Sequence, residues 1–274
     1  TALNLDGDAA LASMKELKGL LDALDRRANI LGLIIFNALA WSDLFIVRRY
    51  LRWQRRNMQN IYSWIDAVSD MDAMVSMATM RYNEPDSCDA QLTDDEGVVF
   101  EAKGLWHPFL GEKAVKNDFT VRDSNYYIIT GANMAGKSTF LRSVGINYIL
   151  AMSGMTVFAD SLKVSVFSLF SSMRTSDDLA GGISYFNAEL LRLKLLLDNV
   201  RQNSRTLIIL DEILKGTNSL DKLNGSRMFL EAAAKLPVTG IIATHDLELS
   251  KMAEAQPERF HNYCFEIKLT DNIT

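Results

Sequence analysis

The chain has 274 residues, enough for a large α/β domain and an accessory segment, and its 48% hydrophobic and 23% charged residues are typical of a globular protein. The formal net charge of −5 excludes a surface that attracts nucleic acid as a whole, so DNA contact needs a local basic patch or parts outside this sequence. The two cysteines, Cys88 and Cys264, lie far apart and argue against a disulfide framework or a zinc site. This cysteine usage and an N-terminal sequence that is no secretion signal predict a cytoplasmic location, and we interpret the chain as a piece of a longer protein.

Residues 1–82 are predicted to be helical. Apolar residues recur there at spacings of three and four, as on one face of a helix: Leu11, Met14, Leu17, Leu21 and Leu24. No proline occurs before Pro85, so nothing forces a break. Four methionines spaced by three residues are predicted to pack in a core: Met71, Met74, Met77 and Met80.

The apolar stretch from Ile30 to Val47 has a length close to that of a membrane-spanning helix. Asn37, Ser42 and Asp43 interrupt it, and the carboxylate of Asp43 would be unfavourable in lipid. A buried helix of a helical bundle is therefore the favoured interpretation, and an upstream membrane tether is the alternative.

A basic cluster, RRYLRWQRR, follows directly. Four of its arginines fall on one face of a helix at about 100° per residue, namely Arg48, Arg52, Arg55 and Arg56. Arginines with Tyr50 and Trp53 between them suit contact with nucleic-acid phosphates. A solvated face, or ion pairs with the acidic remainder, is the favoured interpretation.

Residues 83–274 are predicted to form an α/β domain after a polar junction from Tyr82 to Gly97. Short apolar runs at 127–130, 207–210 and 240–243 alternate there with helical stretches. This alternation predicts a mainly parallel sheet flanked by helices.

The segment YYIITGANMAGKSTF matches the phosphate-binding P-loop pattern G-x-x-x-x-G-K-[ST] at the end of the first apolar run. Glycines let backbone N–H groups turn toward phosphate oxygens, Lys137 reaches the β- and γ-phosphates, and the Ser138 hydroxyl coordinates Mg²⁺. The following helix directs its positive end at the anion. The residues expected to bind the nucleotide are Gly131, Ala132, Asn133, Met134, Ala135, Gly136, Lys137, Ser138 and Thr139.

The segment LIILDE, residues 207–212, ends an apolar strand on two carboxylates. We expect this strand to lie beside the P-loop strand and to deliver Asp211 to Mg²⁺, which accepts one carboxylate directly or through water. Glu212 is then placed to orient or deprotonate the attacking water.

Two further positions are candidates for the same chemistry. Ser184 follows the pair Gly181 and Gly182 and precedes a long helix, so it is either a second anion site or an ordinary helix cap. His245 follows the apolar run 240–243 and is a candidate γ-phosphate sensor, although a lone histidine is more often structural.

These segments, in this order, resemble the ATPase domain of the MutS family, DNA mismatch-repair-type ATPases related to ABC ATPases. TGANMAGKSTFLR resembles the family's TGPNMAGKSTYLR, and LIILDEILKGTNSLD resembles LVLLDEIGRGTSTYD. SDDLAGGISYFNAEL resembles SDDLASGRSTFMVEM, and ATHDLEL resembles ATHYHEL. The resemblance covers residues 100–260 well and extends weakly into the preceding helices, which resemble the end of the family's core and lever region.

The resemblance implies an ABC-like P-loop NTPase fold that binds ATP and Mg²⁺ and couples ATP hydrolysis to the clamping of DNA. It also implies a homodimer with two composite sites, in which Ser184 and Glu189 of one chain face the P-loop, Asp211 and Glu212 of the other. The mismatch-reading domain would lie outside this sequence, and the downstream repair proteins are not identified by it.

The sequence departs from the family pattern at several positions: Ala132 replaces a proline, Leu214 and Lys215 replace Gly-Arg, Asn218 replaces a serine, and Asp246 and Leu247 replace Tyr-His. The aromatic residue that stacks on adenine aligns near Ala114, which leaves base contact to Val115 or another residue. These departures leave two alternatives open. One is a divergent relative, with or without a membrane tether, that acts outside mismatch repair. The other is a dimerisation module switched by ATP with little turnover.

Overall fold

The computed structural model describes residues 7–25, 41–132, 134–173, 191–196, 205–214 and 219–266. The chain divides into two compact units, Thr1–Thr79 and Met80–Thr274.

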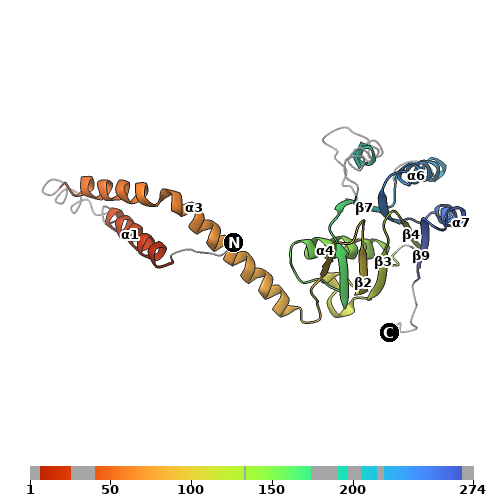
Figure 1. The fold of residues 1–274 in the computed structure, drawn as a ribbon, viewed down its shortest axis with the longest axis horizontal. Coiled ribbons are helices and arrows are strands. Elements are labelled where there is room, and N and C mark those ends of the chain that lie inside the picture. Colours follow the sequence, from red (N-terminus) through yellow and green to blue (C-terminus); the bar gives the residue numbers. More distant parts are fainter. Residues whose placement is uncertain are drawn as a thin grey trace. The chain divides into compact units, whose positions relative to one another are not determined.

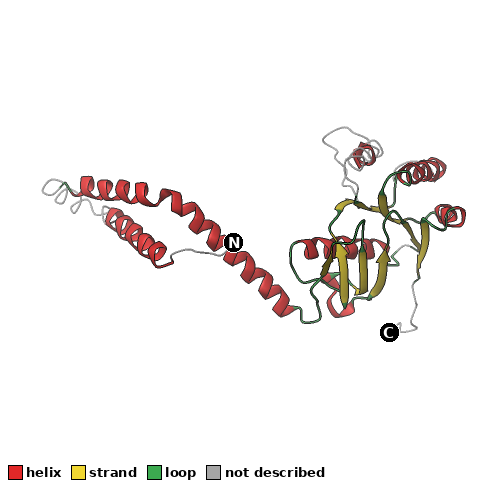
Figure 2. Cartoon of the chain, in the orientation of Figure 1, coloured by secondary structure: helices red, strands yellow, loops and turns green. Residues whose placement is uncertain are grey.

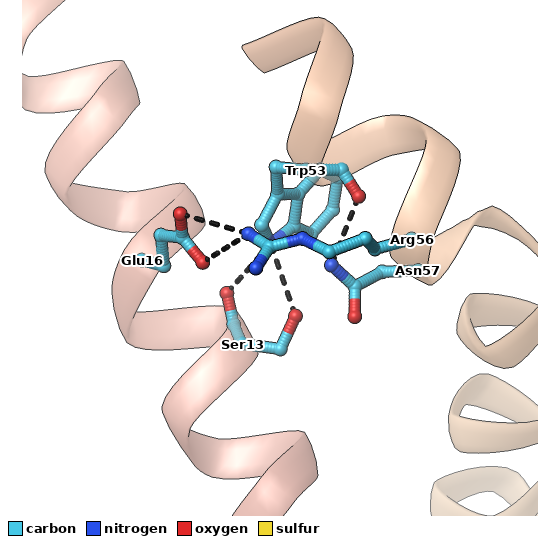
Figure 3. Close-up of polar contacts among 5 residues, drawn as sticks. All are labelled: Ser13, Glu16, Trp53, Arg56 and Asn57. Atoms are coloured by element: carbon cyan, nitrogen blue, oxygen red, sulfur yellow. Dashed lines mark hydrogen bonds and ion pairs between the residues drawn. The ribbon is translucent and has the colours of Figure 1, made fainter. Parts of the chain in front are cut away.

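The described residues of the first unit form two helices, α1 (Gly7–Asp25) and α3 (Ser42–Asn83) (Figure 1). The last four residues of α3, from Met80 to Asn83, belong to the second unit. Trp53 of α3 is only 3% exposed, and its indole N–H donates to the Ser13 carbonyl at 2.9 Å. Arg56 forms an ion pair with Glu16 at 2.9 Å, so one polar seam joins the helices (Figure 3). These contacts determine which side of α1 faces α3.

The buried side of α1 differs from the predicted apolar stripe. Leu20 is buried at 2% exposure, whereas Leu11, Met14 and Leu21 are exposed. The seam through Ser13 and Glu16 sets this face, because residues three and four apart share one side of a helix.

The predicted core packing of the α3 methionines is wrong for Met71 and Met74, which are 59% and 49% exposed. The reason is length: α1 has 19 residues and α3 has 42, so α1 covers only part of α3. Met80, near the end of α3, does pack against the core of the second unit.

No helix in the described part of the chain is long and apolar enough to cross a membrane. Within the apolar stretch of the sequence, residues 30–40 lie outside the described residues. Trp41 to Val47 form the start of α3 and the residue before it, and the tether remains a prediction that no described residue tests.

The described residues of the second unit form two sheets (Figure 2). The four-stranded sheet, here called the small sheet, has the order β1-β5-β2-β3, with β2 antiparallel to both of its neighbours. Its strands are β1 (Gln91–Thr93), β2 (Phe100–Leu105), β3 (Asn117–Val121) and β5 (Ser161–Ser165), and a short 3₁₀ segment, η2 (Pro108–Lys113), joins β2 to β3.

The five-stranded sheet is parallel throughout and has the order β6-β7-β8-β4-β9. Its strands are β4 (Tyr126–Gly131), β6 (Ser168–Ser172), β7 (Thr206–Asp211), β8 (Val238–Ala243) and β9 (Phe260–Phe265). Helical elements around it in the described part of the chain include α4 (Lys137–Met152), α6 (Ser219–Ala233), η3 (Leu247–Ser250) and α7 (Lys251–Ala255), and residues 191–196 are helical as well.

Alternate residues of this sheet enter two different cores, because successive side chains of a strand point to opposite faces. Tyr127, Ile129 and Ile209 pack with α4 and the small sheet, whereas Ile128 and Ile208 pack with α6 and α7. Both faces are therefore covered, which explains why β4, β7 and β8 are continuous apolar runs rather than alternating ones. The predicted α/β fold with a mainly parallel sheet flanked by helices is confirmed.

Asn147 of α4 ties this helix to the small sheet. Its side chain is fully buried, with the amide donating to the carbonyls of Trp106 at 3.1 Å and Ser143 at 2.9 Å. Its carbonyl oxygen accepts from the Phe158 N–H at 2.6 Å. A buried amide with this many partners fixes the position of α4 relative to the segments around Trp106 and Phe158.

Replacing Asn147 by leucine is expected to lower the free energy of unfolding by about 2–4 kcal/mol, because the Phe158 N–H and the Trp106 carbonyl lose their partner inside the core. Urea denaturation of the chain measures this loss. Asn60, exposed on α3, supplies the matched control, and Asn60→Leu should change stability by less than about 0.5 kcal/mol. Equal effects of the two substitutions would contradict the proposed anchoring.

Candidate functional site

The glycine-rich loop lies at the carboxyl end of β4, between this strand and the N-terminus of α4. Parallel α/β sheets bind ligands at this edge, where strand ends, helix N-termini and loops converge. Gly136 is the N-cap of α4 and has no side chain, so the first backbone N–H groups of the helix donate to no capping side chain. An anion is a suitable acceptor for them.

The backbone conformation of the loop depends on two glycines. Gly136 has φ 95° and Gly131 has φ 141°, conformations that L side chains rarely adopt. A Cβ on Gly131 would lie 2.3 Å from the Phe265 carbonyl oxygen of β9, so the loop and the edge strand pass too close for any side chain. Met134 between them has φ 64° and is 99% exposed.

Lys137 is buried at 5% exposure, and its ammonium group has two contacts inside the loop and one outside it. It donates to the carbonyls of Gly131 and Ala132, both at 2.8 Å, and lies 3.3 Å from His245 Nδ1. Burial lowers the pKa of Lys137, and the nearby carboxylates of Glu212 and Asp211 oppose this shift. An arriving phosphate would offer this partly desolvated charge a stronger acceptor than a backbone carbonyl.

Asp211 and Glu212 end β7 at the same edge of the sheet. Asp211 is 7% exposed and pairs in register with Ala243 of β8, which in turn pairs with Ile129 of β4. Contrary to expectation, β7 does not lie beside β4, because β8 is inserted between them. The carboxylates therefore reach the loop across β8 rather than from a neighbouring strand.

His245 bridges the lysine and the second carboxylate. Its Nε2 lies 2.7 Å from Glu212 Oε1, while its Nδ1 faces the Lys137 ammonium. Nε2–H can donate to the Glu212 carboxylate, and Nδ1 lies 3.3 Å from the Lys137 ammonium and 3.1 Å from the Gly131 carbonyl oxygen. The structure thus joins residues 137, 212 and 245 in one hydrogen-bonded chain that the sequence predicted only as separate candidates.

The turn after β7 is strained at two non-glycine residues. Glu212 has φ 57° and Leu214 has φ 59°, in the left-handed region that a leucine rarely adopts. Leu214 occupies a position where the MutS pattern has glycine, yet it is buried at 3% exposure. Its Cδ1 would lie 2.5 Å from a Cβ on Gly225 of α6. The missing side chain at 225 therefore leaves the space that the Leu214 side chain fills.

The substitution Gly225→Ala is expected to destabilise the chain by about 1–3 kcal/mol through overpacking against Leu214, despite the better helix propensity of alanine. Adding Leu214→Ala should recover part of this loss, because the clashing methyl group is removed. A double-mutant cycle from chemical denaturation measures the coupling between the two positions. Strictly additive effects would contradict the packing described for this turn.

A pocket of about 390 Å³ adjoins the loop. Ala135, Gly136 and Thr139 line one side of it, and Val115, which is 76% exposed, lies on another. Cys264 at the end of β9 and Glu266 just after this strand also contribute to the lining. The sequence did not indicate these two residues, because they are some 130 positions from the loop in the chain and carry no local motif.

Three residues assigned to the site from the sequence lie outside the described part of the chain: Asn133, Ser184 and Glu189. Lys215 and Asn218, which depart from the family pattern, also lie outside it. Ser138 is half-buried in the first turn of α4. Among the described residues there is no group of three or more His, Cys, Asp or Glu side chains that could hold a metal ion by itself. Ser138 and Asp211 alone are still compatible with Mg²⁺, because this ion keeps several waters and is commonly held by one or two protein ligands together with substrate phosphates.

The fold and the site define the class first: an α/β protein with a mostly parallel sheet flanked by helices and a polar site at the carboxyl edge of that sheet. Residues 127–273 match the sequence profile of MutS domain V, and this match begins in β4 and includes the loop, the acidic pair and His245. The chain therefore belongs to the MutS family, as its motifs predicted.

Named relatives agree with this assignment. The chain is 32% identical over 216 residues to the DNA mismatch repair protein MutS of Clostridium kluyveri, which covers 75% of this chain and 24% of the relative. It is 33% identical over 211 residues to the protein of the same name from Acetivibrio thermocellus, covering 74% and 24%. It is also 30% identical over 221 residues to MutS protein homolog 4 of Homo sapiens, covering 78% and 23%. The chain thus spans about a quarter of the length of these relatives.

Proposed function

We propose that the chain is the Mg²⁺-dependent ATP-binding and ATP-hydrolysing part of a MutS-type mismatch repair protein, with an ABC-like P-loop NTPase fold. The observation that carries this proposal is the hydrogen-bonded chain from Lys137 through His245 to Glu212, next to an uncapped helix N-terminus and the buried Asp211. Positive charge for phosphate, a carboxylate for metal and a second carboxylate for water are the parts that phosphoryl transfer needs.

In this proposal, residues 131–139 bind the phosphates of ATP through backbone N–H groups and the Lys137 ammonium. Mg²⁺, bound through Ser138 and Asp211, would neutralise charge on the phosphates. Glu212 accepts a proton from the attacking water, and His245 holds the Glu212 carboxylate in place while it faces the γ-phosphate position. The pocket beside Val115 takes the base.

The relatives are named DNA mismatch repair proteins, which supports a role in which ATP turnover is coupled to DNA. We further propose that the full-length protein is a homodimer in which Ser184 of one chain completes the site of the other. DNA contact then involves regions beyond this sequence, in keeping with the net charge of −5.

The test is steady-state ATP hydrolysis by the purified chain and by the full-length protein, with Mg²⁺ or with a chelator, and with no DNA, homoduplex DNA or mismatched DNA. We expect Mg²⁺-dependent turnover that mismatched DNA changes in the full-length protein. ATP-dependent dimerisation without turnover would favour the switched binding module instead. Turnover without any DNA response would favour a divergent relative that acts outside mismatch repair.

A further inference from the structure

The beginning of α3 combines exposed apolar residues and arginines on one face. At about 100° per residue, Leu44 and Phe45 share an arc of roughly 100° with Arg48, Arg52 and Arg55. Leu44 is 58% exposed and Phe45 is 64% exposed, and Trp41, just before the helix, is 66% exposed. Large apolar side chains are thus presented to solvent within one to three helical turns of a cationic cluster.

Arg52 and Arg55 of this face line a groove of about 440 Å³ between α3 and α1, whereas Arg48 does not line it. Its lining consists of Arg49, Arg52, Arg55, Arg56 and Glu16. The single carboxylate among them is already paired with Arg56. Within the described ranges, no ion pair engages Arg49, Arg52 or Arg55, so the groove has an excess of guanidinium groups suited to phosphate.

The aromatic residues inside the cluster are not available to stack on nucleic-acid bases. Trp53 is 3% exposed and donates its N–H to Ser13 in the helix pair (Figure 3), and Tyr50 is half-buried and stacks on Trp53. A single-stranded nucleic acid would need such platforms, whereas a duplex backbone would leave Leu44 and Phe45 in water. A lipid leaflet instead supplies phosphates and acyl chains together.

The spacing along the helix suits a leaflet. Leu44 and Arg55 are 11 positions apart, or about 16 Å at 1.5 Å per residue, and Arg48 lies only about 6 Å from Leu44 along the axis. Interfacial helices bury their apolar residues some 5–10 Å into the boundary between headgroups and acyl chains. Long arginine side chains can then extend to the phosphate level while their methylene stems stay in the apolar layer.

We propose that the N-terminal end of α3 binds the surface of an anionic phospholipid bilayer. Leu44 and Phe45, with Trp41 beside them, enter the boundary between headgroups and acyl chains, and Arg48, Arg52 and Arg55 bind lipid phosphates. This surface uses none of the residues of the nucleotide site, so the lipid-binding proposal can fail or hold without affecting the proposed ATPase.

The test is flotation of the purified chain with vesicles of pure phosphatidylcholine or of phosphatidylcholine containing one-third phosphatidylglycerol. We expect binding to the anionic vesicles only. Arg48→Ala, Arg52→Ala and Arg55→Ala together should weaken this binding on the order of 100-fold, since each arginine near an anionic surface contributes about a factor of five. Lysines at the same three positions should retain most of it.

The matched control removes the same charge from exposed positions elsewhere: Arg122→Ala, Arg205→Ala and Lys235→Ala together. This variant should bind like the parent chain. Acyl chains brominated near the headgroup should quench part of the tryptophan fluorescence, and Trp41→Phe should remove that part. Leu44→Ser with Phe45→Ser should weaken both binding and quenching, and melting curves establish that each variant is folded.

Equal weakening by the control variant, or equal binding to neutral and anionic vesicles, would overturn the proposal. It would also be overturned if the arginine variant lost affinity for a short DNA duplex while the parent chain ignored vesicles, because the surface would then be a nucleic-acid site. Self-association of the chain that Leu44→Ser with Phe45→Ser abolishes, without vesicle binding, would assign the face to a second copy.

Discussion

Glu212→Gln is expected to lower steady-state ATP turnover by about 10²–10⁴-fold while ATP affinity stays within about threefold of the parent value. Glutamine cannot accept a proton from the attacking water. Its amide oxygen can still accept from His245 Nε2–H, the contact that the glutamate makes at 2.7 Å. The change therefore removes the base and keeps the hydrogen-bonded chain through His245 to Lys137.

Phosphate release measures the turnover, and titration with a fluorescent ATP analogue measures the affinity. Glu231→Gln is the matched control, because the substitution makes the same change of charge away from the site. Glu231 lies on α6 and forms a surface ion pair with Arg227. Unchanged turnover in Glu212→Gln would refute the assignment of Glu212. Lost affinity would show that the carboxylate supports the loop rather than the reaction.

Lys137→Met should weaken ATP binding by at least about 100-fold, since a charge-assisted contact to the phosphates is removed from a partly desolvated site. The thermal stability of the Lys137→Met variant is not expected to fall. Burial lowers the pKa of Lys137, which means that the folded state disfavours the charged form relative to the unfolded chain. An uncharged side chain of similar length avoids that desolvation, although the carbonyls of Gly131 and Ala132 lose a donor.

Calorimetric titration with ATP and thermal melting of the same samples measure the two effects separately. Lys163→Met is the control, because Lys163 lies half-buried on the small sheet, away from the site, and among the described residues its ion pair is with Asp95. That substitution should leave ATP affinity unchanged. Parent-like affinity in Lys137→Met would remove the lysine from the phosphate site, and a collapse of its melting temperature would mean that Lys137 serves mainly to hold the loop together.

The fold was largely predictable because its evidence is local. The runs at 127–130, 207–210 and 240–243 are apolar without alternation, which is the pattern of strands covered on both faces, and all three are strands of the parallel sheet. The first unit was harder to predict. A periodic stripe shows that a helix is amphipathic, but the contact from Trp53 to Ser13 decides which side of α1 is buried. Met71 and Met74 are exposed for the related reason that α1 is too short to cover α3.

The candidate site could be predicted from two short segments, because a phosphate loop would need consecutive backbone groups and an acidic pair needs adjacent side chains. The sequence by itself determined the family, the loop at 131–139 and the adjacency of Asp211 to Glu212. Only the tertiary structure decided that β8 separates β7 from β4, that His245 joins Lys137 to Glu212, and that β9 closes the pocket by Val115. It also decided that Leu214 can adopt φ 59° where the family pattern has glycine, because Gly225 leaves room for its side chain. Such contacts join residues far apart in the chain, and they arise from packing that no local pattern encodes.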